Sequence, residues 1–147
     1  MSAPVLIVED SDDEVLLLRR ALKVAGVTAP VSVVHDGHAA IEYLSGRGAF
    51  ADRLQHPLPR LMLLDLKLPR LSGLDVLKWV RAQPGLRRLP VVMLTSSGES
   101  RDVMNAYDLG VNSYLVKPSE MKNLQELARR IHEYWLDVNV HPPFTSD

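Results

Sequence analysis

Short apolar runs alternate with longer amphipathic segments along most of this chain. The apolar runs are about four residues long and lie at 5–8, 31–34, 61–64, 91–94 and 113–116. Short runs with few polar interruptions are typical of strands buried on both faces. After each run, apolar residues recur at a spacing near 3.6, which is typical of helices with one buried face. The pattern therefore predicts five strands, each followed by a helix.

Start and stop residues bound the predicted helices. Ser11 and Glu14 form a capping-box pattern before the first helix, and Gly26 is a natural C-terminal stop. The later helices are predicted over 38–44, 74–82, about 100–109 and about 120–135. Glycines and prolines punctuate residues 45–60, which predicts a loop inserted before the third strand.

Strict strand–helix alternation is typical of an α/β fold with a parallel sheet and helices on both faces. The order of the strands cannot be read from this pattern, although two doubly wound orders are common. In open sheets of this kind, ligands bind beyond the carboxyl ends of the strands. The residues that follow the strands are therefore the first candidates for a functional site.

Polar residues directly follow four of the five predicted strands. They are Glu9 and Asp10, Asp65, Thr95 and Lys117, after the first, third, fourth and fifth strands respectively. The second strand ends in Val34-His35 and adds no such group, which favours an edge position for that strand. The pattern predicts three carboxylates, a hydroxyl and an ammonium at one rim of the sheet.

This set of groups is suited to phosphoryl transfer. Clustered carboxylates repel one another and favour a hard divalent cation such as Mg²⁺, which prefers oxygen ligands. A carboxylate can itself attack phosphorus and become an aspartyl phosphate. A cation, a lysine and a hydroxyl then position and neutralise the transferred group. Asp65 is the best candidate nucleophile, because it follows the predicted central strand.

Composition narrows the class of protein. The chain has 147 residues, of which 24% are charged, and its formal net charge is −1. That length suits one domain, and the near-neutral charge argues against a nucleic-acid binder that relies on bulk positive charge. There is no cysteine, so disulfides and thiolate sites are excluded. We expect no signal peptide, no membrane association and a cytoplasmic location.

The strand-end residues, taken together, resemble those of bacterial response-regulator receiver domains over about residues 4–137. The matching segments are Val8-Glu9-Asp10, Leu64-Asp65-Leu66, Leu68-Pro69, Gly73, Leu94-Thr95-Ser96 and Tyr114 to Pro118. The separations of 30 residues from Asp65 to Thr95 and 52 from Asp65 to Lys117 also fit that family. The resemblance implies a flavodoxin-like, doubly wound sheet with strand order 2-1-3-4-5.

The resemblance also implies a metal site and a phosphoacceptor. Asp65 would accept a phosphoryl group from the phosphohistidine of a histidine kinase. Glu9, Asp10 and Asp65 would hold Mg²⁺ together with the main-chain carbonyl of Lys67. The protein would then be no enzyme beyond catalysing its own phosphorylation and dephosphorylation.

The same resemblance implies a switch around the phosphoryl group. Lys117 would pair with that group and would precede a cis bond to Pro118, since X–Pro bonds adopt cis at low cost. Thr95 would donate a hydrogen bond to the phosphoryl group, and Tyr114 would change rotamer as Thr95 moves. A homodimer would form through the fourth helix, the fifth strand and the last helix.

A narrower resemblance is to stand-alone regulators paired with bacterial and cyanobacterial phytochrome kinases. It rests on the insertion before the third strand, residues 108–114 and the ending Tyr134-Trp135-Leu136. Residues 138–147 would form a C-terminal tail, with no room for an output domain. We therefore expect the signal to leave through a protein contact or as the phosphoryl group itself.

Other interpretations remain for these residues. Singly, each strand-end residue could be a loop or cap residue, and Tyr114 an ordinary aromatic of an edge strand. A haloacid-dehalogenase-type phosphatase also uses a strand-end aspartate, but here Lys67 stands in place of its second acid. A receiver-like interaction module that is never phosphorylated is the main alternative. Arg129 and Arg130 could face solvent or pair with acids across a dimer contact.

Overall fold

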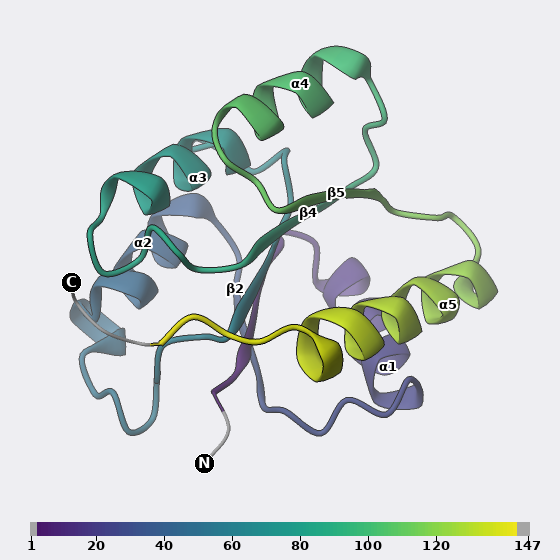
Figure 1. Cartoon of the computed structure of the whole chain (residues 1–147), viewed down its shortest axis with the longest axis horizontal. Coiled ribbons are helices and arrows are strands. Elements are labelled where there is room, and N and C mark those ends of the chain that lie inside the picture. The colour runs from purple at the N-terminus through teal and green to yellow at the C-terminus, as the bar shows by residue number, and fades with distance from the viewer. Residues whose placement is uncertain (1–2, 144–147) are drawn as a thin grey trace.

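The computed structural model describes residues 3–143, and its five strands form one parallel sheet in the order β2-β1-β3-β4-β5 (Figure 1). The elements are β1 (Val5–Val8), α1 (Asp12–Val24), β2 (Val31–Val34), α2 (Gly37–Ser45), β3 (Leu61–Leu64), α3 (Gly73–Ala82), β4 (Val91–Thr95), α4 (Ser100–Asp108), β5 (Ser113–Val116) and α5 (Met121–Ile131). The flavodoxin-like order is confirmed, and β2 lies at an edge as predicted.

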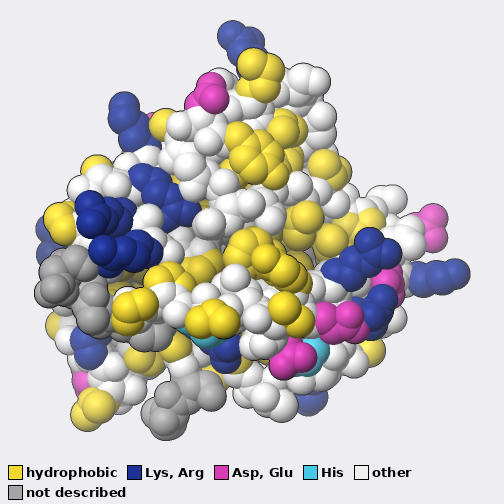
Figure 2. All heavy atoms as spheres, in the orientation of Figure 1, with side chains coloured by type: hydrophobic (Ala, Val, Ile, Leu, Met, Phe, Trp, Pro, Cys, Tyr) yellow, Lys and Arg dark blue, Asp and Glu magenta, His cyan; other side chains and the backbone are white. Residues whose placement is uncertain are grey.

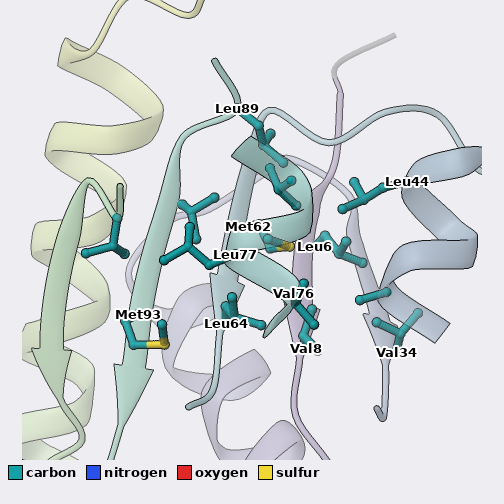
Figure 3. Packing of buried hydrophobic residues seen from close by; sticks show 14 of the residues in the cluster. Leu6, Val8, Val34, Leu44, Met62, Leu64, Val76, Leu77, Leu89 and Met93 are labelled. Atoms are coloured by element: carbon teal, nitrogen blue, oxygen red, sulfur yellow. The ribbon is translucent and has the colours of Figure 1, made fainter. Parts of the chain in front are cut away.

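Helices cover both faces of the sheet, because successive strand residues point to opposite sides. On one face, Leu6, Val8 and Met62 pack with side chains of α2, α3 and α4 in the cluster that Figure 3 shows. On the other face, Val5 and Ile7 pack with α1 and α5. No helix within residues 3–143 is long and apolar enough to cross a bilayer.

The last helical segment differs from the prediction. The α-helix ends at Ile131, and a π-helix, η2 (His132–Val138), continues the chain. Trp135 and Leu136 of η2 still pack against the α1 side of the core, as their apolar character predicts. Apolar spacing over two turns does not distinguish i→i+4 from i→i+5 hydrogen bonding, so the sequence could not predict this change.

The insertion before β3 is ordered by one arginine and a group of rings. Arg53 donates hydrogen bonds to the carbonyl oxygens of Tyr43, Leu44 and His56 at 2.7, 2.8 and 3.0 Å. The rings of Tyr43, Phe50 and His56 lie 5.2–5.9 Å apart, centroid to centroid. A short 3₁₀ turn, η1 (Gly48–Phe50), carries Phe50 into this group.

The C-terminal segment crosses the amino ends of the strands (Figure 1). Arg60, just before β3, donates to the carbonyl of Leu136 at 2.9 Å and to Nε2 of His141. Pro142 and Pro143 lie with His141 beside residues 58–60, 85–86 and 88–90. The predicted tail is therefore docked as far as residue 143, and residues 144–147 lie outside the described part. The domain boundary at Asp137 stays a prediction.

Candidate functional site

Backbone hydrogen bonds just beyond the strands bring the predicted residues to one rim. The Glu9 amide donates to Val34 at 3.1 Å, and the Asp65 amide donates to Val8 at 3.1 Å. On the other side of β3, the amide of Lys117 donates to Thr95 at 2.7 Å. The parallel pairing thus continues past the strand ends, and it fixes where the site residues leave the sheet.

Three carboxylates meet at this rim. Glu9, Asp10 and Asp65 each offer an oxygen within 4.8 Å of the other two. Glu9 and Asp65 are buried, with 3% and 8% of their surfaces exposed, whereas Asp10 is exposed. Two buried carboxylates and one exposed carboxylate, all offering oxygen ligands, fit a hard divalent cation that keeps part of its water shell.

Lys117 lies against these acids from the end of β5. Its ammonium donates to Glu9 and, at 3.3 Å, to Oδ2 of Asp65. Within residues 3–143, Lys117 is the one basic side chain that forms ion pairs in this cluster, and its partners there are Glu9 and Asp65. One cation facing three acids leaves an excess of negative charge, which favours a metal ion at the rim.

Burial and pairing shift the proton affinities of these groups. Burial raises the pKa of Glu9 to about 7, although the hydrogen bond from Lys117 acts in the opposite direction. Burial by itself would lower the pKa of Lys117, but hydrogen bonds to Glu9 and Glu14 outweigh it and hold that pKa above its usual value. Lys117 therefore stays charged at neutral pH.

Glu14 joins the site, which the sequence did not predict. Ser11 caps α1 by accepting from the Glu14 amide at 3.3 Å, as the capping-box pattern requires. The return bond is different, because the Ser11 amide donates to Glu9 at 3.1 Å rather than to Glu14. The Glu14 carboxylate instead accepts from Lys117 at 2.9 Å. Half of the predicted capping box is thus replaced by a contact across 103 residues of chain.

The loop after β4 is tied to Tyr114 and α4. Thr95 is buried, with 1% of its surface exposed. The Tyr114 hydroxyl donates to the carbonyl of Ser97 at 2.8 Å, and the Ser97 hydroxyl donates to Asp102 at 2.5 Å. Burial raises the pKa of Tyr114. Tyr114 is therefore hydrogen-bonded to the loop that follows Thr95, whereas an ordinary aromatic residue of an edge strand would have only packing contacts.

The loop between β3 and α3 approaches the Asp65 backbone closely. A Cβ atom at Gly73 would lie 2.1 Å from the carbonyl oxygen of Asp65, so this position requires glycine. Arg70 adopts a left-handed conformation, with φ 66°, within the same loop. The Lys67 amide lies 3.4 Å from Oδ1 of Asp65, while metal binding by the Lys67 carbonyl stays a prediction.

One expectation at the site changes with the structure. The Lys117–Pro118 bond is trans, so the expected cis bond is wrong. X–Pro bonds favour trans by about 0.5–1 kcal/mol, and the Lys117 contacts to the acids form with the trans bond. Arg129 and Arg130 are exposed, as the first of their two interpretations expects, and both pair with Glu126 of their own helix. Arg129 also pairs with Glu133.

Sequence comparison identifies the family. Residues 5–129 match the response regulator receiver domain. The chain is 39% identical over 141 residues to the probable methanogenesis regulatory protein FilR2 of Methanothrix harundinacea, covering 94% of this chain and 86% of that protein. It is 36% identical over 138 residues to the response regulator Rcp1 of Synechocystis, covering 94% and 92% of the two chains.

Solved structures agree with the sequence matches. The phosphorylated cyanobacterial phytochrome response regulator RcpA superposes with a TM-score of 0.90 at 34% identity, over 97% of this chain and 100% of RcpA. RPA3017, from red light signaling of R. palustris, has a TM-score of 0.91 at 34% identity, over 97% and 99%. The Mn²⁺-bound form of Rcp1 has a TM-score of 0.87 at 35% identity, over 97% and 100%. This chain therefore belongs to the response regulator receiver domain family.

Proposed function

We propose that this protein is a phosphorylation-controlled response regulator in which Asp65 is the phosphoacceptor. The observation that carries the proposal is the meeting of Asp65 with Glu9, Asp10 and Lys117 at one rim of the sheet. The donor is a histidine kinase, as is general for receiver domains. The protein acts on its own phosphoryl group and turns over no other substrate.

The transfer step needs little from the protein beyond position and charge. A carboxylate oxygen of Asp65 attacks phosphorus and forms the new P–O bond. The P–N bond to the kinase imidazole breaks, and the imidazole keeps the bonding pair. Lys117 neutralises charge on the phosphoryl oxygens, and Thr95 supplies a hydroxyl donor from the neighbouring strand end. Such electrostatic stabilisation is the main source of catalysis in phosphoryl transfer.

Glu9, Asp10 and Asp65 would hold a divalent cation, with the main-chain carbonyl of Lys67 as a further ligand. We propose Mg²⁺ for this role, because Mg²⁺ combines one or two carboxylates with phosphate oxygens and waters. The bound cation would neutralise negative charge on the transferred group. The similar regulator Rcp1 has been crystallised in a Mn²⁺-bound form, which supports a divalent ion of this hard, oxygen-binding kind.

Thr95 and Tyr114 are the proposed switch. A phosphoryl group on Asp65 would draw the Thr95 hydroxyl toward it and move the loop that carries Ser97. Because the Tyr114 hydroxyl is bonded to that loop, the Tyr114 rotamer would respond to the same movement. A local change of charge thereby biases a two-state element, which then alters the α4–β5 surface.

The kinase partner is proposed to be of the phytochrome class. The support is the likeness over nearly the whole chain to RcpA, a phytochrome response regulator, and to RPA3017, a regulator in red light signaling. Phosphotransfer from a purified phytochrome kinase should be faster than transfer from a kinase with another sensor. Equal rates from both kinases would remove this assignment and leave the receiver function standing.

Mass spectrometry tests the central proposal. The protein is incubated with Mg²⁺ and acetyl phosphate, and its intact mass is compared with that of Asp65→Asn treated in the same way. We expect a phosphate-sized adduct on the parent and none on the variant. An unlabelled parent would favour the alternative, a receiver-like interaction module that works without phosphorylation.

A further inference from the structure

A fourth carboxylate shares Lys117 with the site. The ammonium donates to Oε1 of Glu14 at 2.9 Å, to Oδ2 of Asp65 at 3.3 Å, and to Glu9. A lysine ammonium has three N–H donors, so all three are already used by carboxylates. A phosphoryl oxygen can therefore accept a hydrogen bond from Lys117 only if one of these three carboxylates gives up its own.

Of the three carboxylates, Glu14 is the one that would still compete with a phosphoryl group for the Lys117 ammonium after phosphorylation. Asp65 would itself carry the phosphoryl group, and Glu9 belongs to the proposed metal ligands. Glu14 has neither role, and its predicted cap bond is absent because Glu9 accepts from the Ser11 amide. The Glu14 side chain is 48% exposed, whereas that of Lys117 is 14% exposed, so Glu14 covers the ammonium from the solvent side.

A cleft between α1 and α5 fixes this arrangement in space. Glu14, Leu17, Lys117, Pro118 and Leu124 line it, so the ammonium is bordered by apolar side chains as well as by acids. Apolar neighbours reduce the solvent screening of the Glu14–Lys117 pair. The pair is therefore stronger than one between two freely exposed side chains.

We infer that Glu14 is a positioning residue that restrains Lys117 and weakens its hold on the phosphoryl group. The inference rests on the proposed function, because it concerns the phosphorylated state of Asp65. A phosphoryl group carries a charge of roughly −1.5 to −2, and an ammonium already paired with Glu14 attracts it less. Glu14 thus shortens the lifetime of the signal without touching the transferred group.

Titration with beryllofluoride, an anionic mimic of the phosphoryl group, tests this role in the presence of Mg²⁺. Glu14→Gln keeps the size of the side chain and removes its charge. We expect it to tighten beryllofluoride binding by about two- to fivefold, the scale of one partly exposed ion pair. The lifetime of the aspartyl phosphate, followed by intact mass after labelling with acetyl phosphate, should lengthen by a similar factor.

Asp13→Asn is the matched control. Asp13 lies in the same first turn of α1, is exposed, and has no hydrogen-bond or ion-pair partner for its side chain within residues 3–143. This variant removes the same charge from the same turn, so it should leave both readouts unchanged. Equal tightening in Asp13→Asn would show a general effect of charge and would overturn the role assigned to Glu14.

A Lys117→Ala background separates an effect through Lys117 from direct repulsion of the anion. In this background, adding Glu14→Gln should not change the affinity for beryllofluoride. If Lys117→Ala alone does not bind the anion, the double variant should not bind it either. Recovery of binding in the double variant would contradict the inference, as would unchanged or weaker binding in Glu14→Gln alone. A parent protein that neither binds beryllofluoride nor becomes labelled would instead contradict the proposed function.

Discussion

Lys117 is the residue on which the site's electrostatics depend. It faces two buried acids, Glu9 and Asp65, and a half-exposed one, Glu14, and its pKa is raised by hydrogen bonds that outweigh burial. Breaking a partly buried ion pair leaves the remaining charge without compensation. The three clustered carboxylates outnumber this single ammonium, which supports the proposed divalent cation at the same side chains.

Asp10 offers the most direct test of the metal site. It is the exposed member of the carboxylate cluster, so its loss should perturb folding least. We expect Asp10→Asn to weaken Mg²⁺ binding in calorimetry by about tenfold or more, the scale seen when even outer partners of a metal are lost. Asp13→Asn serves as the control. Unchanged Mg²⁺ affinity in Asp10→Asn would remove Asp10 from the ligand set.

Gly73 positions Asp65 through its backbone. Gly73→Ala places a Cβ atom against the Asp65 carbonyl, and we expect it to lower the free energy of unfolding by about 1–3 kcal/mol, as overpacking does. Labelling by acetyl phosphate should slow as well. Gly98→Ala is the control, because its Cβ would meet Val116 at 3.5 Å, an ordinary contact. The free energies of unfolding of the two variants are compared by urea denaturation. Equal values would argue against the role of Gly73 in positioning the Asp65 backbone.

At the scale of elements, Arg60 donates hydrogen bonds to the described part of the C-terminal segment, at Leu136 and His141. Nε2 of His141 accepts from Nε of Arg60 at 3.0 Å, while its Nδ1 is buried without a partner. Burial and the Arg60 charge lower the pKa of His141. A protonated His141 would lose its acceptor nitrogen and place a second positive charge beside Arg60. The docking of residues 139–143 is thus sensitive to pH.

The sign of that dependence follows from the lowered pKa. The unfolded or undocked chain binds a proton to His141 more readily than the docked one, so docking is stabilised at high pH. This contribution is present above about pH 6.5 and is lost as the pH falls through the pKa of the docked form. Hydrogen exchange should show residues 136–143 becoming less protected between pH 7.5 and 5.5.

His141→Gln is the matched variant for this experiment, because glutamine cannot titrate in that range. Its exchange profile should be nearly independent of pH after correction for intrinsic rates. Loss of protection to the same extent in parent and variant would assign the pH effect to another group. The measurement reads the tail directly and does not depend on phosphorylation.

At the scale of the whole molecule, exposed apolar side chains lie on α4, β5 and η2, on the side that Figure 2 shows. Met104 and Tyr107 of α4, Val116 of β5 and Tyr134 of η2 are 49–64% exposed. We propose this face as the contact of a homodimer, in keeping with the predicted surface of the fourth helix, the fifth strand and the last helix, whose final turn the structure assigns to η2. The face also includes Tyr114, so phosphorylation and dimerisation would be coupled.

Tyr107→Glu tests the dimer. Burying a charge in an apolar contact is costly, so we expect the variant to weaken self-association by at least about tenfold. Sedimentation across a range of concentrations, with and without beryllofluoride, measures this. Leu54→Glu is the control, because Leu54 is 86% exposed and lies in the insertion away from this face. A parent that stays monomeric under both conditions would exclude the dimer.

The sequence by itself determined the alternation of strands and helices, since both periodicities are local and strongly patterned. It also determined which polar residues leave the strand ends, because Asp65 and Thr95 directly follow apolar runs. The resemblance to receiver domains then supplied the strand order. The trans bond before Pro118 and the π-helix of η2 were not predicted, because neither leaves a local pattern in the residue types.

Only the tertiary structure decided how the side chains share partners. Local rules assign Glu14 to its own helix cap, yet its carboxylate pairs with Lys117 while Glu9 caps the Ser11 amide. Arg60 and His141 meet across 81 positions of sequence, and no local signal marks that contact. Such choices depend on which groups are buried together, and burial is set by the packing of the whole chain.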